Sequence, residues 1–214
     1  ASPPALDQPL PPGLVATDQG ARAALATLPA LRPQVRDPGG LDGVPGMRIN
    51  VLGLIQIENV PTGQRLTPRQ TELLVYLALR GDTTGPAMDE DLWPGSRTDG
   101  VARWGLAYRT RRIVMDTNLP RTEKGDTLHL GPGVSCDWDD FRRHAAAGLA
   151  AGAEGLSDLK AALDLVRGRP LTGVPPSAYS WADRDTDAMI SAIADVAHTL
   201  AHLLLDSGDS RAAL

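Results

Sequence analysis

Apolar and polar residues alternate in two short runs that begin shortly before residue 50. Ile49 and Val51 alternate with polar residues in the first run, and Ile55 and Ile57 do so in the second. A period of two predicts half-buried strands, and the glycine between the runs, Gly53, marks a turn or a bulge. We therefore expect two short strands here, or one strand with a bulge.

The alternation then changes to a helical period. Thr67 offers a hydroxyl cap, Pro68 suits the first helical position, and Gln70 stands three residues after the cap. Leucines recur at positions that share one helix face, and Gly81 follows as a natural end. These signals predict a helix from Pro68 to about Arg80.

Two more helices and a hairpin are expected before residue 131. The pattern predicts a short helix over residues 86–93 and a third helix from about Thr98 to about Met115. Two strand-like stretches follow, residues 121–123 and 126–130, and Gly125 between them supplies the positive φ of a tight turn. Strands, three helices and a hairpin in this order are the layout of a winged helix-turn-helix.

The two flanking regions differ from this central part. Residues 1–46 hold nine of the 18 prolines, which predicts a Pro/Gly-rich linker. Residues 137–214 have helical periodicity throughout and stop inside an alanine-rich run, so we expect a truncated helical domain and a piece of a longer protein. The predicted fold is mainly α with a small β component, with a winged helix-turn-helix domain over residues 47–136.

Charge is distributed unevenly along the chain. The net charge is -5, yet residues 97–112 hold five arginines against one aspartate. A local basic stripe suits phosphate contacts, although a solvated helix face would have the same composition. The single cysteine, Cys136, cannot form an internal disulfide and suits a reducing compartment, so we expect a cytoplasmic protein. No apolar run approaches the roughly 20 residues that span a bilayer.

The third helix carries the best candidates for contact with double-stranded DNA. Arginine can bond two acceptors of guanine or clamp a phosphate, and residues three apart share a helix face. Ion pairing with Asp116 or with the acidic second domain is the alternative for the arginines of the helix. Closure of the core is the alternative for Tyr108. A solvated hairpin tip is the alternative for Arg121 and Lys124. The candidates are Arg103, Tyr108, Arg109, Arg111, Arg112, Arg121 and Lys124.

Other chemistry is sparse. His198 and His202 stand one helical turn apart with aspartates nearby, but further ligands at suitable spacing are missing, so we expect no metal site. No arrangement of nucleophile, base and acid is evident, so we expect neither catalysis nor a cofactor. Trp104 is expected mainly in the core.

Four of these stretches resemble the winged-helix module of the Streptomyces antibiotic regulatory protein family: residues 48–53, 68–80, 91–94 and 109–112. The helical part resembles the bacterial transcriptional activator domain that follows it in that family. Residues 165–176, with Trp181 and residues 190–198, are similar to one actinobacterial subgroup whose large proteins join membrane segments, a LysM module and this pair of domains.

The resemblance implies a transcription regulator whose third helix enters the major groove and whose hairpin touches the DNA backbone or minor groove. It also implies a tetratricopeptide-like helical domain for dimerisation or contact with other proteins, and a membrane tether only through parts absent from this chain. Gly105 and Arg103 stand where the family usually has a leucine stripe. A protein-interaction module that no longer binds DNA therefore remains the alternative function.

Overall fold

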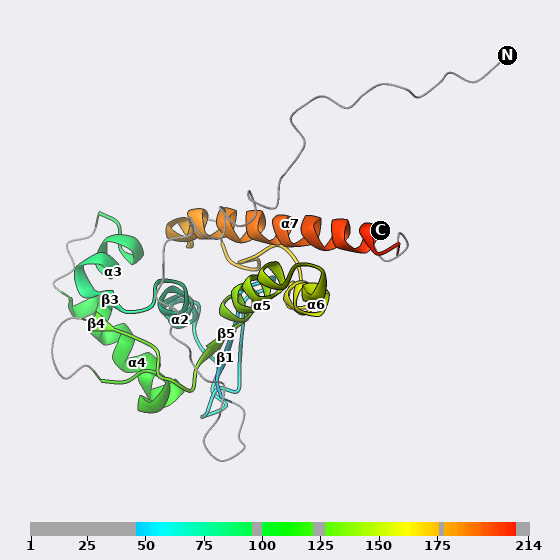
Figure 1. The fold of residues 1–214 in the computed structure, drawn as a ribbon. Coiled ribbons are helices and arrows are strands. Elements are labelled where there is room, and N and C mark those ends of the chain that lie inside the picture. Colours follow the sequence, from blue (N-terminus) through cyan, green and yellow to red (C-terminus); the bar gives the residue numbers. More distant parts are fainter. Residues whose placement is uncertain (1–45, 96–99, 122–126, 176–177, 209–214) are drawn as a thin grey trace.

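The fold is known from a computed structural model that describes residues 46–95, 100–121, 127–175 and 178–208 (Figure 1). Helices dominate it, with a few very short strands. The elements in chain order are β1 (Arg48–Asn50), β2 (Gln56–Glu58), α2 (Pro68–Arg80), β3 (Thr83–Thr84), α3 (Gly85–Leu92), α4 (Val101–Asn118), β4 (Thr127–Leu128), β5 (Ser135–Cys136), α5 (Asp137–Ala151), η2 (Gly152–Gly155), α6 (Leu156–Asp164), η3 (Ser180–Ala182) and α7 (Asp183–Asp206).

Two small sheets organise the first half of the described chain, residues 46–136. The predicted strands β1 and β2 pair antiparallel, and β5 joins β1 on its other side in parallel. β4 pairs antiparallel with β3, a partner that the sequence did not suggest. The sequence suggested residues 121–123 instead, and most of that stretch lies outside the described residues. Of that stretch only Arg121 is described, and it lies outside any strand. β3 has only two residues, too few to produce a recognisable alternation.

α2 is the central helix of the first half. Its predicted start is confirmed, because the Thr67 hydroxyl accepts from the Gln70 amide while the Gln70 side chain accepts from the Thr67 amide. Proline at the first turn and Gly81 with φ 70° at the end complete the expected boundaries. Five consecutive side chains from Leu73 to Leu77 are buried, so α2 is enclosed on most sides.

α4 begins and ends about three residues later than the sequence predicted. It runs from Val101 to Asn118, and Met115 breaks it with φ 70° and ψ 159°. A left-handed φ is costly for methionine, so surrounding contacts must hold this kink. The inward face of the helix packs on α2, and it is formed by Arg103, Leu106, Ala107, Thr110, Val114 and Asn118.

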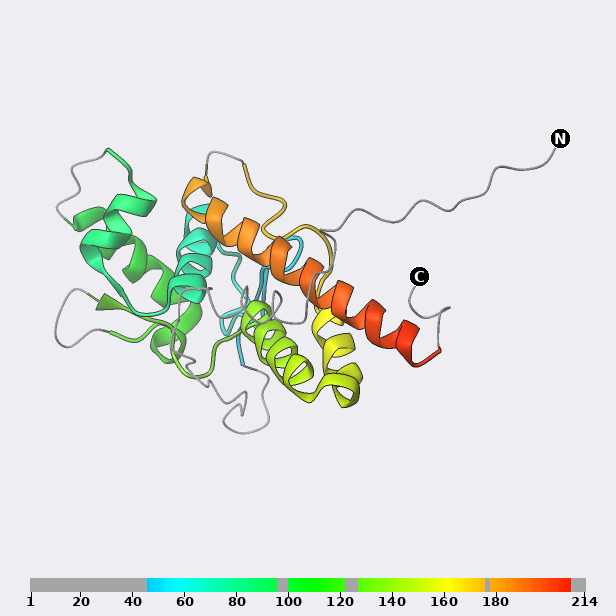
Figure 2. The ribbon, with the colours of Figure 1, turned by 45° about the horizontal axis from the view of Figure 1, so that its top comes forward.

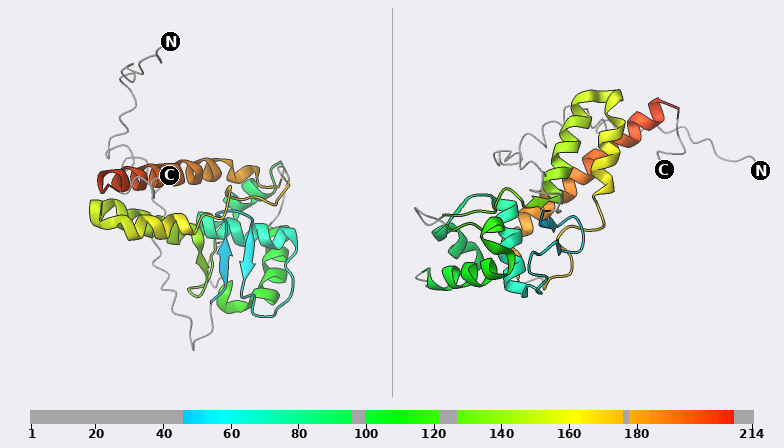
Figure 3. Two further views of the ribbon diagram at one scale, coloured as in Figure 1. Left: turned by 90° about the vertical axis from the view of Figure 1, so that its right-hand side faces the viewer. Right: turned by 90° about the horizontal axis from the view of Figure 1, so that it is seen from below.

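The second half consists of a helix hairpin, α5 and α6, with α7 lying across it (Figure 3). α5 and α6 approach closely at two glycines: a Cβ on Gly148 would lie 2.7 Å from the Leu159 side chain, and one on Gly155 would lie 2.0 Å from a backbone oxygen. α7 turns its apolar residues inward, although Ile190 and Leu205 stay exposed. Its buried residues are Met189, Ala192, Val196, Leu200 and Leu204.

From the sequence we expected no apolar run long enough to span a bilayer, and α7 departs from that expectation. Together with η3 it is long and apolar enough to cross a bilayer, by length and composition alone, with a mean hydropathy of 1.5 and 22% of its apolar window buried. In the structure it packs on α5 and α6 (Figure 2). One such helix is weak evidence for a membrane span, because a mostly buried core helix of a folded domain meets the same criterion.

A dense set of polar contacts, here named the seam, joins the two halves. At its centre is the carboxylate of Asp137, which is 1% exposed and accepts the amides of Val51 at 2.8 Å and Leu52 at 3.0 Å. Nη2 of Arg167 donates to the same carboxylate at 2.8 Å. The backbone of residues 167–172 then bonds to the turn between β1 and β2, so a loop of the second half extends the sheet region of the first.

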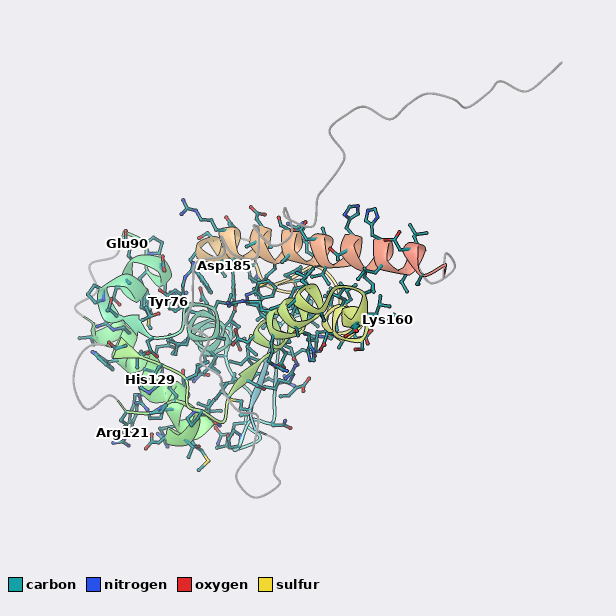
Figure 4. The ribbon with its side chains drawn as sticks, viewed as in Figure 1. Tyr76, Glu90, Arg121, His129, Lys160 and Asp185 are labelled. Atoms are coloured by element: carbon teal, nitrogen blue, oxygen red, sulfur yellow. The ribbon has the colours of Figure 1, made fainter. Side chains whose placement is uncertain are left out.

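Aromatic and charged residues make a second link between α2 and the start of α7. The Trp181 indole donates to Glu72 at 3.2 Å and meets the Tyr76 ring edge-on at 4.9 Å. Arg80 bonds Asp185 at 2.7 Å and the carbonyl of Trp181 at 3.1 Å. Tyr76 and Asp185 mark this contact in Figure 4. Burial raises the pKa of Asp185.

Candidate nucleic-acid interface

The outward side of α4 is the surface on which the sequence places DNA contact. α4 lies at the edge of the first half, with its inward face against α2 and its outward face away from α5, α6 and α7 (Figures 1 and 3). We call this outward side the α4 face. Its exposed residues are Val101, Ala102, Trp104, Tyr108, Arg109, Arg112, Met115, Asp116 and Thr117.

Arg109 and Arg112 are the two candidate arginines that reach this face. Both are exposed, and they stand three residues apart, so their side chains emerge on the same side of the helix. Within the described part of the chain neither forms a hydrogen bond or an ion pair. From Gly100 to Met115 the sequence has no acidic residue, and Asp116 is the first one after it.

Arg103 points into the protein, so the prediction that it contacts DNA is wrong. It is 3% exposed, and its guanidinium bonds the carboxylate of Asp89 on α3. It also lies 5.4 Å from the ring centre of Trp104. The physical reason is helical periodicity: position 103 precedes Leu106 and Thr110 on the buried face, where only a paired charge is tolerated.

The guanidinium of Arg111 is already hydrogen-bonded within the protein. Its Nε donates to the carbonyl of Leu119 at 2.7 Å and its Nη2 to the carbonyl of Pro120 at 3.1 Å. The side chain is 11% exposed and stands 3.5 Å from Asp116. Desolvation lowers the pKa of the Arg111 guanidinium. These contacts hold the chain as it leaves the kinked end of α4, so Arg111 is a structural residue in this fold.

The α4 face is more apolar than the sequence analysis recognised. Tyr108 is 56% exposed, so it does not close the core, and Trp104, which was expected mainly inside, is 37% exposed. Val101 is 73% exposed and Met115 is 51% exposed. The signal was readable, because positions 101, 104, 108 and 115 follow the spacing of one helix face. Four of the seven exposed large apolar side chains in the described residues are on α4.

Gly105 lies at the centre of this face. A glycine inside a helix costs about 1 kcal/mol relative to alanine. Its backbone has no positive φ, and an added Cβ would meet only the terminal Nη1 of Arg109, at 3.3 Å. Gly148, in contrast, is required by the close approach of α6. Packing within the described residues therefore explains Gly148 but does not explain Gly105.

The predicted wing is partly described. Arg121 is exposed at the far end of α4 (Figure 4), and its Nε lies 3.3 Å from Asp116, which reduces the local positive charge. Lys124 lies outside the described residues. The wing residues therefore provide one exposed arginine beside the α4 face, paired with a carboxylate at the surface.

Outside α4, two histidines of α7 form an exposed pair of titratable side chains. Nε2 of His198 and Nε2 of His202 lie 3.1 Å apart on the exposed side of the helix. Within the described ranges no three His, Cys, Asp or Glu side chains converge to hold a metal ion. The pair is accounted for by a hydrogen bond between the two rings.

Comparison with known proteins supports the fold. Mycobacterium tuberculosis EmbR, solved in complex with a low-affinity phosphopeptide, is similar over 78% of this chain, with a TM-score of 0.63 and 20% sequence identity. The chain spans about half of that protein, 47% of its length. A winged helix followed by a helical domain is thereby confirmed, and the fold is of the kind found in the Streptomyces antibiotic regulatory protein family. No family model and no curated protein sequence matches the chain.

Proposed function

We propose that this chain is the DNA-binding and partner-binding part of a transcription regulator. In this proposal the α4 face enters the major groove, and the helical half provides contacts for dimerisation or for another protein. The observation that carries it is the exposed pair Arg109 and Arg112 on the outward side of the third helix of a winged-helix fold. The EmbR-like fold supports the proposal.

Charge and chemistry on the α4 face agree with this function. Arg109 and Arg112 have no carboxylate partner in the described residues, so their guanidinium groups can bond phosphate oxygens or the O6 and N7 atoms of guanine. No acidic residue precedes Asp116 on α4, so the part of the helix before Asp116 adds no negative charge that would repel the DNA backbone. Arg121 would add a phosphate contact from the side. Lys124 retains its proposed role as a wing contact.

A second candidate function is docking of a protein on the same face. The observation that favours it is the set of exposed apolar side chains, Val101, Trp104, Tyr108 and Met115. Protein interfaces are enriched in aromatic residues, methionine and arginine, and all of these are present on α4. In this alternative the winged helix no longer binds DNA.

The resemblances extend the proposal further. We infer membership of the Streptomyces antibiotic regulatory protein family, and within it of the actinobacterial LysM-containing subgroup. The protein would work in the cytoplasm, tethered to a membrane only through other parts of a longer chain. The proposed activity is binding, without catalysis and without a cofactor.

Fluorescence anisotropy with labelled genomic fragments tests the DNA proposal. We expect binding whose affinity falls steeply with salt, with a log–log slope of about -0.9 for each phosphate contacted. The double variant Arg109→Ala/Arg112→Ala should lose most of the affinity and reduce the slope by about 2.

The matched control is Arg143→Ala/Arg184→Ala, which removes two exposed arginines from α5 and α7. It should bind like the wild type. Equal losses in both double variants would reflect net charge alone and contradict a role for the α4 face. Absence of DNA binding, combined with capture of a protein that Tyr108→Ala abolishes, would instead support the second candidate.

A further inference from the structure

We propose that the centre of the α4 face, around Gly105, accommodates the C5-methyl group of a thymine next to a guanine in the major groove. This inference rests on the proposed DNA binding and names the base chemistry that the helix would recognise. It starts from Gly105, a helical glycine that the described part of the fold does not require.

The surroundings of Gly105 define what could fill the gap that its missing side chain leaves. Side chains at i-4, i+3 and i+4 border a helical position, and here they are Val101, Tyr108 and Arg109. Val101 and Tyr108 are both more than half exposed. The gap is therefore about the size of one methyl group, bordered by apolar groups on two sides and by a guanidinium on the third.

Among the groups in the major groove, the C5-methyl of thymine is the apolar one that a flat helix surface can contact. Glycine permits the backbone to approach a ligand more closely than any other residue. Nη1 of Arg109 already lies 3.3 Å from the position that a Cβ on Gly105 would occupy. A base beside the thymine would then meet Arg109, and guanine offers the O6 and N7 acceptors that arginine prefers.

Charge complementarity selects DNA as the occupant of this face. Val101, Gly105, Tyr108, Arg109 and Arg112 present apolar and cationic groups with no carboxylate among them. A phosphate backbone with methyl groups at the groove edge matches that combination. Val101 and Tyr108, which also suit a protein partner, thereby gain a role in DNA recognition.

The test uses the 214-residue chain and duplexes that it selects from a random-sequence library. Each thymine in a selected duplex is replaced by deoxyuridine, which lacks only the C5-methyl. At one thymine beside a guanine, we expect the wild type to lose about tenfold in affinity, as for one methyl group in an apolar contact. Gly105→Ala should bind the thymine and deoxyuridine duplexes equally, at the reduced level.

Stability provides the second measurement. Gly105→Ala should raise the melting temperature by about 2–4 °C, since alanine is the better helix former. The added methyl would meet only the end of the flexible Arg109 side chain, at 3.3 Å, and that end can shift. The matched control Ala147→Gly removes a methyl from an exposed position of α5, away from the α4 face. It should lower the melting temperature and keep the preference for thymine over deoxyuridine.

The outcomes separate this inference from the function on which it rests. If the wild type selects no duplex, the proposed DNA binding fails and the inference with it. If the wild type binds DNA but deoxyuridine changes nothing at any position, or Gly105→Ala keeps the wild-type preference, DNA binding stands and the methyl contact is overturned. A stabilised Gly105→Ala that has lost the preference supports it.

Discussion

The seam and the α4 face use arginine in opposite ways. In the seam the guanidinium of Arg167 bonds a carboxylate that is almost fully buried, Asp137, and two backbone amides complete the arrangement. On the α4 face Arg109 and Arg112 project into solvent. The comparison teaches that an arginine-rich stretch has no single function. Position on the helix and the nearest carboxylate or carbonyl decide whether each arginine stabilises the fold or remains available to a partner.

The largest expected effect is at the centre of the seam. Asp137→Ala removes the acceptor of two buried amides and leaves Arg167 without its partner, so we expect a loss of about 3–5 kcal/mol in the free energy of unfolding. Urea denaturation measures it. The control Asp139→Ala, at a half-exposed position of the same helix turn, should cost less than about 1 kcal/mol. Similar losses in both variants would show that the seam is not a stabilising contact.

The next effect separates the inward arginine from the outward one. Arg103→Ala breaks a buried ion pair with Asp89 and should cost about 3 kcal/mol, while Arg112→Ala should change stability by less than about 0.5 kcal/mol. For DNA affinity we expect the opposite order, with a larger loss in Arg112→Ala than in Arg103→Ala. A double-mutant cycle with Asp89→Ala checks the pair, and additive losses in that cycle would refute the coupling.

Arg111 should give an intermediate result. Arg111→Ala frees the carbonyls of Leu119 and Pro120 from their donors, and we expect a loss of about 1–2 kcal/mol. Arg111→Lys should recover little of it, because a single ammonium cannot reproduce the geometry by which Nε and Nη2 reach two carbonyls. Thermal melts of the two variants provide the measurement. Full recovery by lysine would show that charge, and not this geometry, holds the end of α4.

The smallest effect concerns Cys136, on the strand that joins β1. Burial raises the pKa of its thiol well above 9.0 in the folded protein. Stability from this group is complete below the unfolded pKa and is lost as the pH rises, because the unfolded thiol then ionises while the folded one cannot. Between about pH 9 and 10 we expect a loss of about 1 kcal/mol relative to Cys136→Ala. Identical pH profiles of the two proteins would contradict it.

Local signals were sufficient to predict some elements. The start of α2 was readable because Thr67, Pro68 and Gln70 interact within one turn, and β1 and β2 because their alternation reflects one buried face. The winged-helix layout followed from the order of these elements. These features depend on neighbours in sequence, so sequence patterns contain them.

The roles within α4 depended on partners far along the chain. Arg103 is buried because Asp89 on α3 reaches it, and Arg111 because the chain folds back after Met115. Neither partner is marked by spacing. The seam was missed for the same reason, since the loop 167–172 has no periodicity that indicates pairing with β1. The exposed stripe at 101, 104 and 108 was visible in the sequence but was not recognised as a stripe. Trp104 was expected mainly in the core, and Tyr108 was a candidate for DNA contact with closure of the core as its alternative.

The seam also has a consequence for synthesis on the ribosome. The ribosome makes Val51 and Leu52 before the carboxylate that accepts their amides, which comes 86 and 85 residues later, and the loop around Arg167 follows later still. The turn between β1 and β2 therefore cannot complete its hydrogen bonds until residues 137–172 have been made. During synthesis the winged helix would remain incompletely folded and accessible to chaperones. Folding would be completed only when both halves are present.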